Sequence, residues 1–430
     1  MLLLKILFLL LSLGGAIYLA WKKPQGLIYL LPVAIALEIS RTWYPGMELF
    51  HNEEGTFSLT RIVTVAILFA AALDLWKKRE LRARLWEVIR HPLTWAFAIY
   101  IVIGAFSSIY SVNRVKTLVE VVRLFSLLLL MIGIATIARK ENAKTVMKVV
   151  HTTGVLLVPF ALYEFFTRKF LWFEYFADWN PPRVNATFVD PNIFARYLIL
   201  AIVANLVLQT FQPGERKKLL YPLCLIGLLG ALVVTFSRAG LVTLAIVMLA
   251  MALVLSVKEV FRSLGLLGAG VVTAFIARPS LLQRFMDIKS GLADLDPGRK
   301  YLGKAALAMF QDHPVLGVGM GGFQKSFITN YSWLKTLPEG PTLSHTTLLT
   351  ITAELGALGV LALLGVFLSI IKTLKKLRNS RYYSIGAGYL VWILTVFTSS
   401  QFEARFFEDP TLWLSAAMIL VLDVQDRISF

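Results

Sequence analysis

Residues 346–371 are TTLLTITAELGALGVLALLGVFLSII, an almost unbroken apolar run whose single ionisable side chain is Glu354. A helix needs roughly 20 apolar residues to cross the hydrocarbon core of a bilayer. The chain supplies such runs repeatedly, and 57% of its 430 residues are hydrophobic. Because backbone polar groups in lipid must be satisfied within each segment, the sequence predicts an all-α, polytopic integral membrane protein.

We predict 12 or 13 transmembrane helices. Residues 1–21 decide between the two numbers, because they resemble a secretory signal in length but have only Lys5 near the start and no small-x-small cleavage site before Lys22. We interpret them as a retained span, which places the N-terminus outside. The candidate spans are residues 1–21, 26–40, 58–76, 92–110, 117–138, 147–166, 193–211, 219–236, 240–257, 263–277, 346–371, 384–400 and 411–424.

Lysine and arginine concentrate in five connections between these spans, and such connections favour the cytoplasmic side. Even numbers of spans separate them throughout, so all five can lie on one face, and the other loops then lie on the outer, periplasmic-type face. The five connections are Lys77-Lys78-Arg79 with Arg82 and Arg84, Arg139-Lys140 with Lys144, Arg216-Lys217-Lys218, Lys258 with Arg262, and Lys372 with Lys375-Lys376, Arg378 and Arg381.

This topology divides the chain into three parts. We predict an N-terminal transmembrane bundle over residues 1–277, which includes an outer loop at 167–192, a large periplasmic loop over residues 278–345, and C-terminal transmembrane helices over residues 346–430. The large loop is the longest polar stretch of the chain, and Tyr301–Phe310 has the pattern of a helix within it.

The formal net charge of +17 is accompanied by one cysteine and five histidines. On a chain with mostly short loops this charge predicts membrane lipids and anionic lipid-linked substrates as partners, and no nucleic acid. Cys224 alone excludes an intrachain disulfide and a cysteine-ligated cluster. The histidines show no HxH, HxxH or HExxH spacing, so we expect no cofactor and no metal.

His345 follows Ser344 at the end of the large outer loop, and histidine is the usual general base near neutral pH. Arg238 lies in the tight turn Ser237-Arg238-Ala239-Gly240 at an outer membrane boundary, where a guanidinium is costly unless it faces a cavity or an anion. We expect its side chain to point into the bundle. Arg299 follows Pro297-Gly298 at a helix start that suits a phosphate.

Each of these residues also has a plain structural interpretation. His345 is then a helix-capping residue beside Ser344, Arg238 reaches lipid phosphates, and Arg299 is a solvated loop residue. Together, one base and two cations on the outer face predict a site for an anionic leaving group.

The segment Asn185–Asn192 is a predicted helix start, with Asp190 or Asn192 as its N-cap. Arg183 and Arg196 flank this segment and are candidates to add positive charge to the anion site. Asn192 and Ser237 are secondary candidates. The glycine-rich stretch Pro314–Phe323 lacks a Walker lysine, so it predicts a tight connector whose backbone approaches another element.

The spacing Pro314-x-x-Gly317-x-Gly319 with Phe323, followed by His345 and by Glu354-Leu355-Gly356, resembles the signature region of the O-antigen ligase and polymerase family. Thr235-Phe236-Ser237-Arg238 and Asn185–Asn192 resemble the two upstream motifs in the expected order. The motifs cover residues 170–375. Family members often have asparagine after the histidine, where this chain has Thr346.

The resemblance implies a metal-independent glycosyltransferase of the bacterial inner membrane. It would move a glycan from undecaprenyl diphosphate to an acceptor sugar hydroxyl on the periplasmic face, in lipopolysaccharide biosynthesis with lipid A–core as acceptor. It implies that His345 matches the catalytic histidine and that Arg238 and Arg299 match the diphosphate-binding arginines. An O-antigen or exopolysaccharide polymerase of the same family is the alternative.

The chemistry agrees with this implication. Diphosphate leaves as an anion and needs cations to stabilise its charge, whereas the attacking hydroxyl needs a base, and direct displacement inverts the anomeric centre. A metal-dependent enzyme would instead use outer carboxylates such as Asp294-Leu295-Asp296. A lipid-linked glycan transporter or flippase would use charges at mid-depth, for which Glu120, Arg123 and Glu164 are the candidates.

Overall fold

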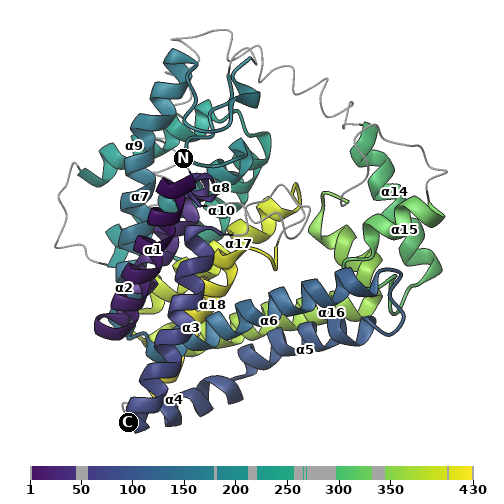
Figure 1. The fold of residues 1–430 in the computed structure, drawn as a ribbon, viewed down its shortest axis with the longest axis horizontal. Coiled ribbons are helices and arrows are strands. Elements are labelled where there is room, and N and C mark those ends of the chain that lie inside the picture. Colours follow the sequence, from purple (N-terminus) through teal and green to yellow (C-terminus); the bar gives the residue numbers. More distant parts are fainter. Residues whose placement is uncertain are drawn as a thin grey trace.

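The computed structural model describes residues 2–44, 57–178, 182–211, 220–255, 265, 268, 297–331, 344–403 and 406–428. In these ranges every regular element is a helix and none is a strand, as the sequence predicts (Figure 1). The α-helices are α1 (Leu2–Lys22), α2 (Pro24–Ala36), α3 (Leu59–Lys77), α4 (Arg79–Arg90), α5 (Pro92–Ser107), α6 (Arg114–Ile137), α7 (Lys140–Thr167), α8 (Pro191–Phe211), α9 (Leu220–Val234), α10 (Arg238–Val254), α14 (Pro297–Asp312), α15 (Phe323–Asn330), α16 (Thr347–Lys376), α17 (Tyr383–Ser400) and α18 (Pro410–Ile428).

The predicted spans coincide with these helices to within two turns. The exception is residues 263–277, which lie outside the described residues apart from 265 and 268. Six described helices (α1, α3, α6, α7, α8 and α16) are long and apolar enough to cross a membrane, and α4 with α5, bent by 61°, makes a seventh if the pair is one span. The shorter α2, α9, α10 and α18 are also apolar. The chain is therefore a multi-pass membrane protein, and the total of 12 or 13 spans stays a prediction.

The helix ends gather into two groups at opposite ends of the bundle. At one end, the Thr187 hydroxyl just before α8 donates to the Ala36 carbonyl at the end of α2 at 2.6 Å. At the other end, His91 Nε2 at the start of α5 lies 2.9 Å from Asp423 Oδ2 near the end of α18. Both contacts agree with the predicted alternation of basic loops, of which Arg216-Lys217-Lys218 and Lys258 with Arg262 lie outside the described residues.

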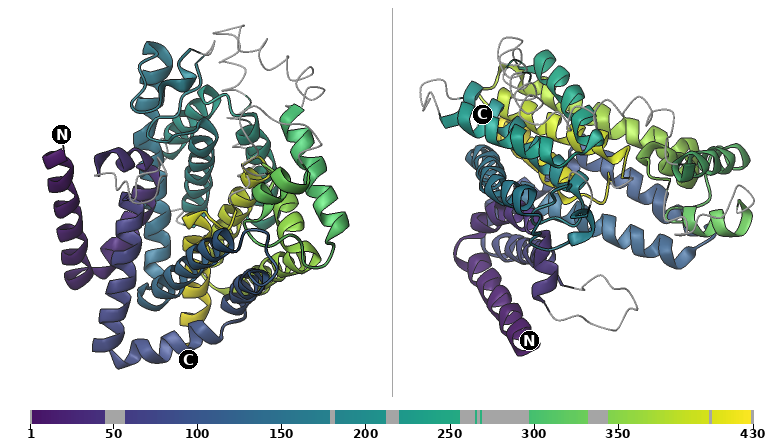
Figure 2. Two further views of the ribbon diagram at one scale, coloured as in Figure 1. Left: turned by 45° about the vertical axis from the view of Figure 1, so that its right-hand side comes forward. Right: turned by 90° about the horizontal axis from the view of Figure 1, so that it is seen from above.

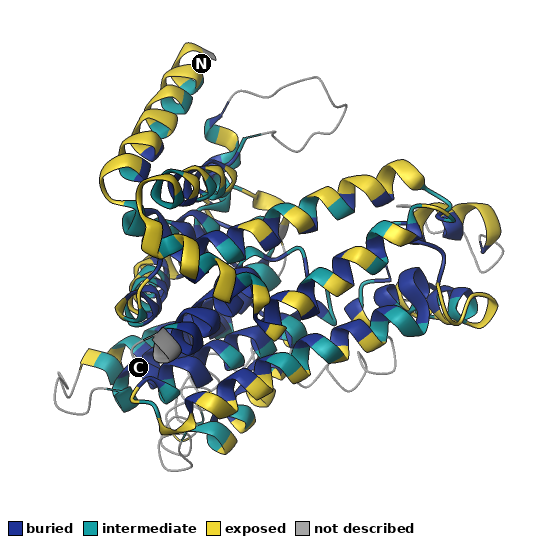
Figure 3. Cartoon of the chain, turned by 90° about the horizontal axis from the view of Figure 1, so that it is seen from below, coloured by how far each residue is buried: buried dark blue, intermediate teal, exposed yellow. Residues whose placement is uncertain are grey.

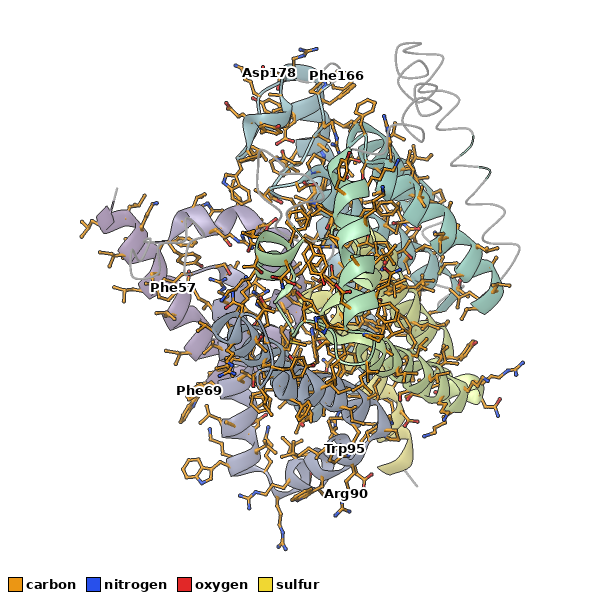
Figure 4. The ribbon with its side chains drawn as sticks, turned by 90° about the vertical axis from the view of Figure 1, so that its right-hand side faces the viewer. Phe57, Phe69, Arg90, Trp95, Phe166 and Asp178 are labelled. Carbon is orange, nitrogen blue, oxygen red and sulfur yellow. The ribbon has the colours of Figure 1, made fainter. Side chains whose placement is uncertain are left out.

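Figure 4 shows the two ends, with Phe166 and Asp178 at one and Arg90 and Trp95 at the other. We name them the His345 end and the Lys140 end, after the residues at the starts of α16 and α7. Which of them faces the periplasm stays a prediction.

The buried core lies around α8, α17 and α18, and Figure 3 shows dark, buried helices beside the C-terminus in the middle of the molecule. Trp392 is fully buried, and its indole N–H donates to the Leu200 carbonyl of α8 at 3.0 Å. By contrast α1 exposes Leu3 and Leu10, 82% and 60% accessible. Exposed leucine on a helix of spanning length indicates a lipid-facing surface.

Helix α4 was not predicted, because its sequence is one of the basic connections. Its residues alternate charged and apolar groups with a helical period, and Val88 is buried while Trp86 is exposed. His91 ends it and caps α5 by accepting a hydrogen bond from the Leu93 N–H at 3.1 Å. An amphipathic helix with basic residues is typical of a membrane surface.

Helices α14 and α15 lie beyond the ends of α5, α6 and α16, to one side of the main bundle (Figure 2). A second small core of Leu302, Met309, Phe323 and Phe327 joins them. The Tyr331 hydroxyl donates to Asp312 at 2.5 Å, and burial together with this bond raises the pKa of Tyr331 to about 12. The predicted helix at 301–310 is part of α14, so the large loop is partly helical, as expected. The predicted division into three parts is not tested by these observations.

Candidate active site at the His345 end

The segment before α8 is fixed by a buried carboxylate. Glu164, fully buried near the end of α7, accepts hydrogen bonds from the backbone N–H groups of Asn185 at 3.2 Å, Ala186 at 2.8 Å and Leu171 at 3.0 Å. Ala186 has a φ of +46°, a conformation that costs an alanine roughly 1–3 kcal/mol and persists only where the surroundings determine it. Glu164 therefore holds this loop in place through hydrogen bonds to its backbone.

A polar cluster joins the two upstream motif segments. Asn192 Oδ1 accepts from Arg183 Nη2 at 3.1 Å and from the Ser237 hydroxyl at 2.7 Å. Arg183 Nε also donates to the Thr235 carbonyl at 3.2 Å. The structure thus brings Arg183, Asn192 and Ser237 together at the starts of α8 and α10.

The start of α8 settles which residue caps it. Asp190 Oδ1 accepts from the Asn192 N–H at 2.6 Å, so the carboxylate of Asp190 caps the helix. The side chain of Asn192 is left to bind Arg183 and Ser237.

Arg238 is the first residue of α10. Ser237 caps the helix by accepting from the Gly240 N–H at 2.9 Å, and a Cβ at Gly240 would lie 2.9 Å from Ala195 Cβ of α8. This close packing fixes the backbone of the turn. The Arg238 side chain is exposed, so it is not buried inside the bundle as its expected orientation would suggest, although the turn is tight.

Arg196 has a different environment from Arg238. It is 9% exposed, and its guanidinium makes two ion pairs, with Glu403 at 3.1 Å and with Asp409 at 3.0 Å. Buried charges need such partners. As a ligand for diphosphate, Arg196 would have to share its guanidinium with two carboxylates of residues 401–410.

His345 lies immediately before α16 and has a φ of +59°. Ser344 stabilises this turn, since its Oγ accepts from the Thr346 N–H at 3.3 Å and lies 2.6 Å from Thr350 Oγ1. Histidine is among the residues that tolerate a left-handed backbone best. Among the described residues, three of the four non-glycine positions with positive φ (Ala186, Phe236 and His345) lie in the three motif segments.

The glycine-rich stretch 314–323 packs on a break in α16. Gly356 has φ +57° and ψ −152°, outside the helical region. The freed carbonyls of Ala353 and Glu354 accept from the N–H groups of Val318 at 3.0 Å and Gly319 at 2.9 Å. A Cβ at Gly356 would lie 2.5 Å from the Val315 carbonyl carbon. The prediction of a tight connector approaching another element is confirmed.

The same stretch also binds α5 and α6. The Met320 N–H donates to Ser107 Oγ at 3.0 Å, and the Thr117 hydroxyl donates to the Met320 carbonyl at 2.6 Å. Phe323 N–H donates to the Glu354 carboxylate at 3.2 Å. Helices α14 and α15, which flank the stretch, are therefore held in a set position relative to α16.

Arg299 lies in the first turn of α14 and is exposed. One turn later, a Cβ at Gly303 would lie 3.7 Å from Leu349 Cδ1, in the first turn of α16. The start of α14 thus lies beside the start of α16.

The candidate charges of the transporter interpretation are paired. Arg123 Nη2 lies 3.0 Å from Glu120, and its Nη1 lies 2.9 Å from Glu408. No group of three potential metal ligands occurs within the part of the chain that is described. Asp294 and Asp296, the alternative metal motif, lie outside that part.

Residues 401–410, a short charged segment on the predicted outer face, supply ion-pair partners that the sequence pattern did not assign. This segment supplies Glu403 and Asp409 to Arg196 and Glu408 to Arg123. One signal was present: three carboxylates lie in a short segment on the same predicted face as the arginines, so they are the obvious counter-ions.

The comparison with known protein families concerns the central part of the chain. Residues 223–364 match the family model described as O-antigen ligase. Over this region the chain is similar to the O-antigen ligases. The match confirms the predicted resemblance to the O-antigen ligase and polymerase family. No curated protein matches the chain.

The matched region covers most of α9, all of α10, α14 and α15, and the first part of α16. Arg238, Arg299 and His345 therefore all lie inside it. Arg183, Asn192 and Arg196 lie before it in sequence, and the contacts of Asn192 with Ser237 join them to it.

Proposed function

We propose that the protein is a metal-independent, inverting glycosyltransferase that moves a glycan from a polyprenyl diphosphate to a sugar hydroxyl. The carrying observation is that the region matching the O-antigen ligase family model contains His345, Arg238 and Arg299, each in the first turn of a helix or just before one. The basic connections that follow α3, α6 and α16 lie away from the His345 end, which supports placing the reaction on the periplasmic face of the bacterial inner membrane.

In this proposal His345 is the general base. It takes the proton of the acceptor hydroxyl as the oxygen attacks the anomeric carbon of the donor sugar. The bond from that carbon to the diphosphate oxygen breaks, and its electron pair leaves with the diphosphate. The new bond forms on the opposite face of the carbon, so the configuration inverts. A base within hydrogen-bond reach typically contributes about 10²–10⁴-fold to the rate.

Arg238 and Arg299 stabilise the departing diphosphate. Both side chains are exposed at the N-terminal turns of α10 and α14, where helix N–H groups add a positive potential that favours phosphate. Arg183 is a secondary candidate, because Asn192 and the Thr235 carbonyl orient its guanidinium. We assign Arg196 to the support of the site, since Glu403 and Asp409 already neutralise it.

The polyprenyl chain of the donor needs an apolar surface inside the membrane. A cavity of about 530 Å³ lies between α2 and α7 and follows α7 for three to four turns. It reaches Thr187, in the loop that connects to Asn192 and the arginines. Its lining consists of Val33, Leu37, Lys148, Val149, Thr152, Thr153, Leu156, Leu157, Phe160, Leu171 and Thr187. We assign it to the first isoprene units.

The paired charges favour an enzyme over a transporter. Glu120, Arg123 and Glu164 are all engaged in ion pairs or in backbone hydrogen bonds, so they hold helices and loops together. A transporter would need charges that change partners during its cycle.

The decisive experiment is reconstitution of the purified protein in liposomes with a polyprenyl diphosphate-linked glycan and candidate acceptors, in the presence of EDTA. We expect a glycosidic product and release of polyprenyl diphosphate. Strict dependence on Mg²⁺ or Mn²⁺ would assign the chemistry to Asp294 and Asp296. Movement of intact lipid-linked glycan without a new glycosidic bond would exclude the enzyme.

The product also distinguishes the two members of the family. We propose the ligase reaction, in which lipid A–core captures the glycan in one step. A ladder of repeats on the polyprenyl carrier would assign the protein to the polymerases instead.

A further inference from the structure

Helix α16 begins without a capping side chain of its own. Its N-cap residue, Thr346, makes no side-chain cap, although the first N–H groups of a helix have no partner within it. The missing acceptor comes from Gln401, one residue past the end of α17, whose Oε1 accepts from the Leu348 N–H at 3.2 Å. The helix that follows His345 is therefore capped by a different helix.

Gln401 is itself held in place. Its Nε2 donates to the Phe397 carbonyl at 2.9 Å, which fixes the amide orientation. Its backbone carbonyl accepts from the Thr346 hydroxyl at 3.1 Å, and the neighbouring Ser400 carbonyl accepts from the Thr347 hydroxyl at 3.1 Å. The three residues that follow His345 are thus all bonded to the end of α17.

These bonds lie beside the strained backbone of His345. The φ of +59° at His345 is a conformation that surrounding contacts must maintain. A small rotation of the first turn of α16 would change the direction of the imidazole. Residues 401–409 also hold α8 through Glu403 and Asp409, so the same segment links His345 to the elements that carry the arginines.

We propose that Gln401 is a positioning residue for His345, which fixes the first turn of α16 so that the imidazole meets the acceptor hydroxyl. The inference rests on the proposed function, because it requires that His345 acts on the substrate. Gln401 itself takes no part in proton transfer or diphosphate binding.

The chain contains a matched control at the opposite end. Gln425 of α18 caps α7 in the same way: its Oε1 accepts from the Lys140 N–H at 3.0 Å, and its Nε2 donates to the Ala138 carbonyl at 2.9 Å. The two glutamines make equivalent interhelical caps, but Gln425 lies at the Lys140 end, away from His345.

The test compares Gln401→Ala with Gln425→Ala in proteoliposomes. Displacement of a catalytic group by about 1 Å costs on the order of 10²-fold in rate. We therefore expect Gln401→Ala to lower kcat by about 10–100-fold, with KM for donor and acceptor changed less than about twofold, and we expect Gln425→Ala to leave kcat within about twofold. Equal losses of kcat in the two variants at equal losses of Tm would contradict the inference.

A second readout does not depend on catalysis. Hydrogen exchange of a peptide covering residues 345–352 reports the Leu348 amide directly. We expect faster exchange in Gln401→Ala and unchanged exchange in Gln425→Ala. Unchanged exchange in Gln401→Ala would overturn the inference even if transfer fell.

A conservative variant completes the design if Gln401→Ala folds poorly. Gln401→Glu keeps an oxygen that can accept from the Leu348 N–H, and a carboxylate is favourable at a helix N-terminus, but it loses the bond to the Phe397 carbonyl. We expect it to recover part of the lost kcat. A higher KM at unchanged kcat in Gln401→Ala or in Gln401→Glu would contradict the positioning role and show that Gln401 contacts a substrate.

The outcomes separate this inference from the proposed function. If the unaltered protein forms no glycosidic product, the proposed function is wrong, and the exchange experiment still decides whether Gln401 caps α16. If product forms and depends on His345, but Gln401→Ala behaves like Gln425→Ala, the positioning role alone is wrong.

Discussion

The two ends of the helix bundle use the same residue types in different ways. At the Lys140 end, His91 and Asp423 form a buried pair at 2.9 Å, and Gln425 satisfies the start of α7. At the His345 end, Arg238 and Arg299 are exposed in the first turns of their helices, and all four of the described non-glycine residues with positive φ lie there. The difference agrees with our proposal that the His345 end is the substrate-binding end, because strained backbone tends to persist at functional sites.

The largest expected effect concerns the strained histidine. His345→Asn keeps a residue that tolerates a left-handed backbone but removes the base. We expect glycan transfer to fall by about 10²–10⁴-fold with Tm nearly unchanged, measured as product formation in proteoliposomes. His313→Asn, at an exposed histidine just after α14, should retain transfer. Full activity of His345→Asn would contradict the role of His345 as the base, and with it the functional difference between the two ends.

Arg196 tests whether a paired charge at the His345 end is structural. Arg196→Met leaves Glu403 and Asp409 without their cation, and loss of one partner of a buried ion pair typically costs about 3–5 kcal/mol. We expect a large fall in Tm.

A compensated variant separates the two roles of Arg196. Combining Arg196→Met with Glu403→Gln and Asp409→Asn removes all three charges and should restore much of the Tm together with the donor KM. Restored Tm with a persistently raised donor KM would show instead that Arg196 binds the diphosphate.

A substitution at Arg238 tests whether this exposed side chain stabilises the departing diphosphate. We expect Arg238→Ala to lower transfer by about 10²–10³-fold, or roughly 2.7–4 kcal/mol in the barrier, the usual effect of losing one group that stabilises a developing anion. Stability should change little, since the side chain is exposed. Arg114→Ala, at another exposed arginine in the first turn of a helix, is the control. Equal effects of the two would indicate a general loss of positive charge.

The smallest expected effect concerns the strained backbone at Gly356. Gly356→Ala introduces a Cβ 2.5 Å from the Val315 carbonyl carbon at a φ of +57°, which should lower stability by roughly 1–3 kcal/mol and loosen residues 314–323 from α16. Gly365→Ala lies on the same helix with no atom within 4 Å of the new Cβ. It should be neutral or stabilising by up to about 1 kcal/mol. Thermal unfolding in detergent measures both.

Candidate site residues could be named from the sequence where residue type alone carries the chemistry. His345, Arg238 and Arg299 were selected because a base and two cations lay on one predicted face. The glycine-rich stretch was expected to approach another element, since glycine permits close contact, and Gly356 and Gly319 do so. The exposure of the Arg238 side chain was not predicted, because it depends on how the start of α10 packs against its neighbours.

The sequence by itself determined that the chain is all-helical and crosses the membrane many times, because the lipid leaves a long apolar segment no other way to satisfy its backbone. It also determined which helix ends share a face, through the distribution of lysine and arginine. Only the tertiary structure decided that Arg196 is neutralised by Glu403 and Asp409 and that Gln401 caps α16. These pairings join residues far apart in the sequence, and they depend on which helices are neighbours, which the packing of α8, α16, α17 and α18 establishes and no local pattern records.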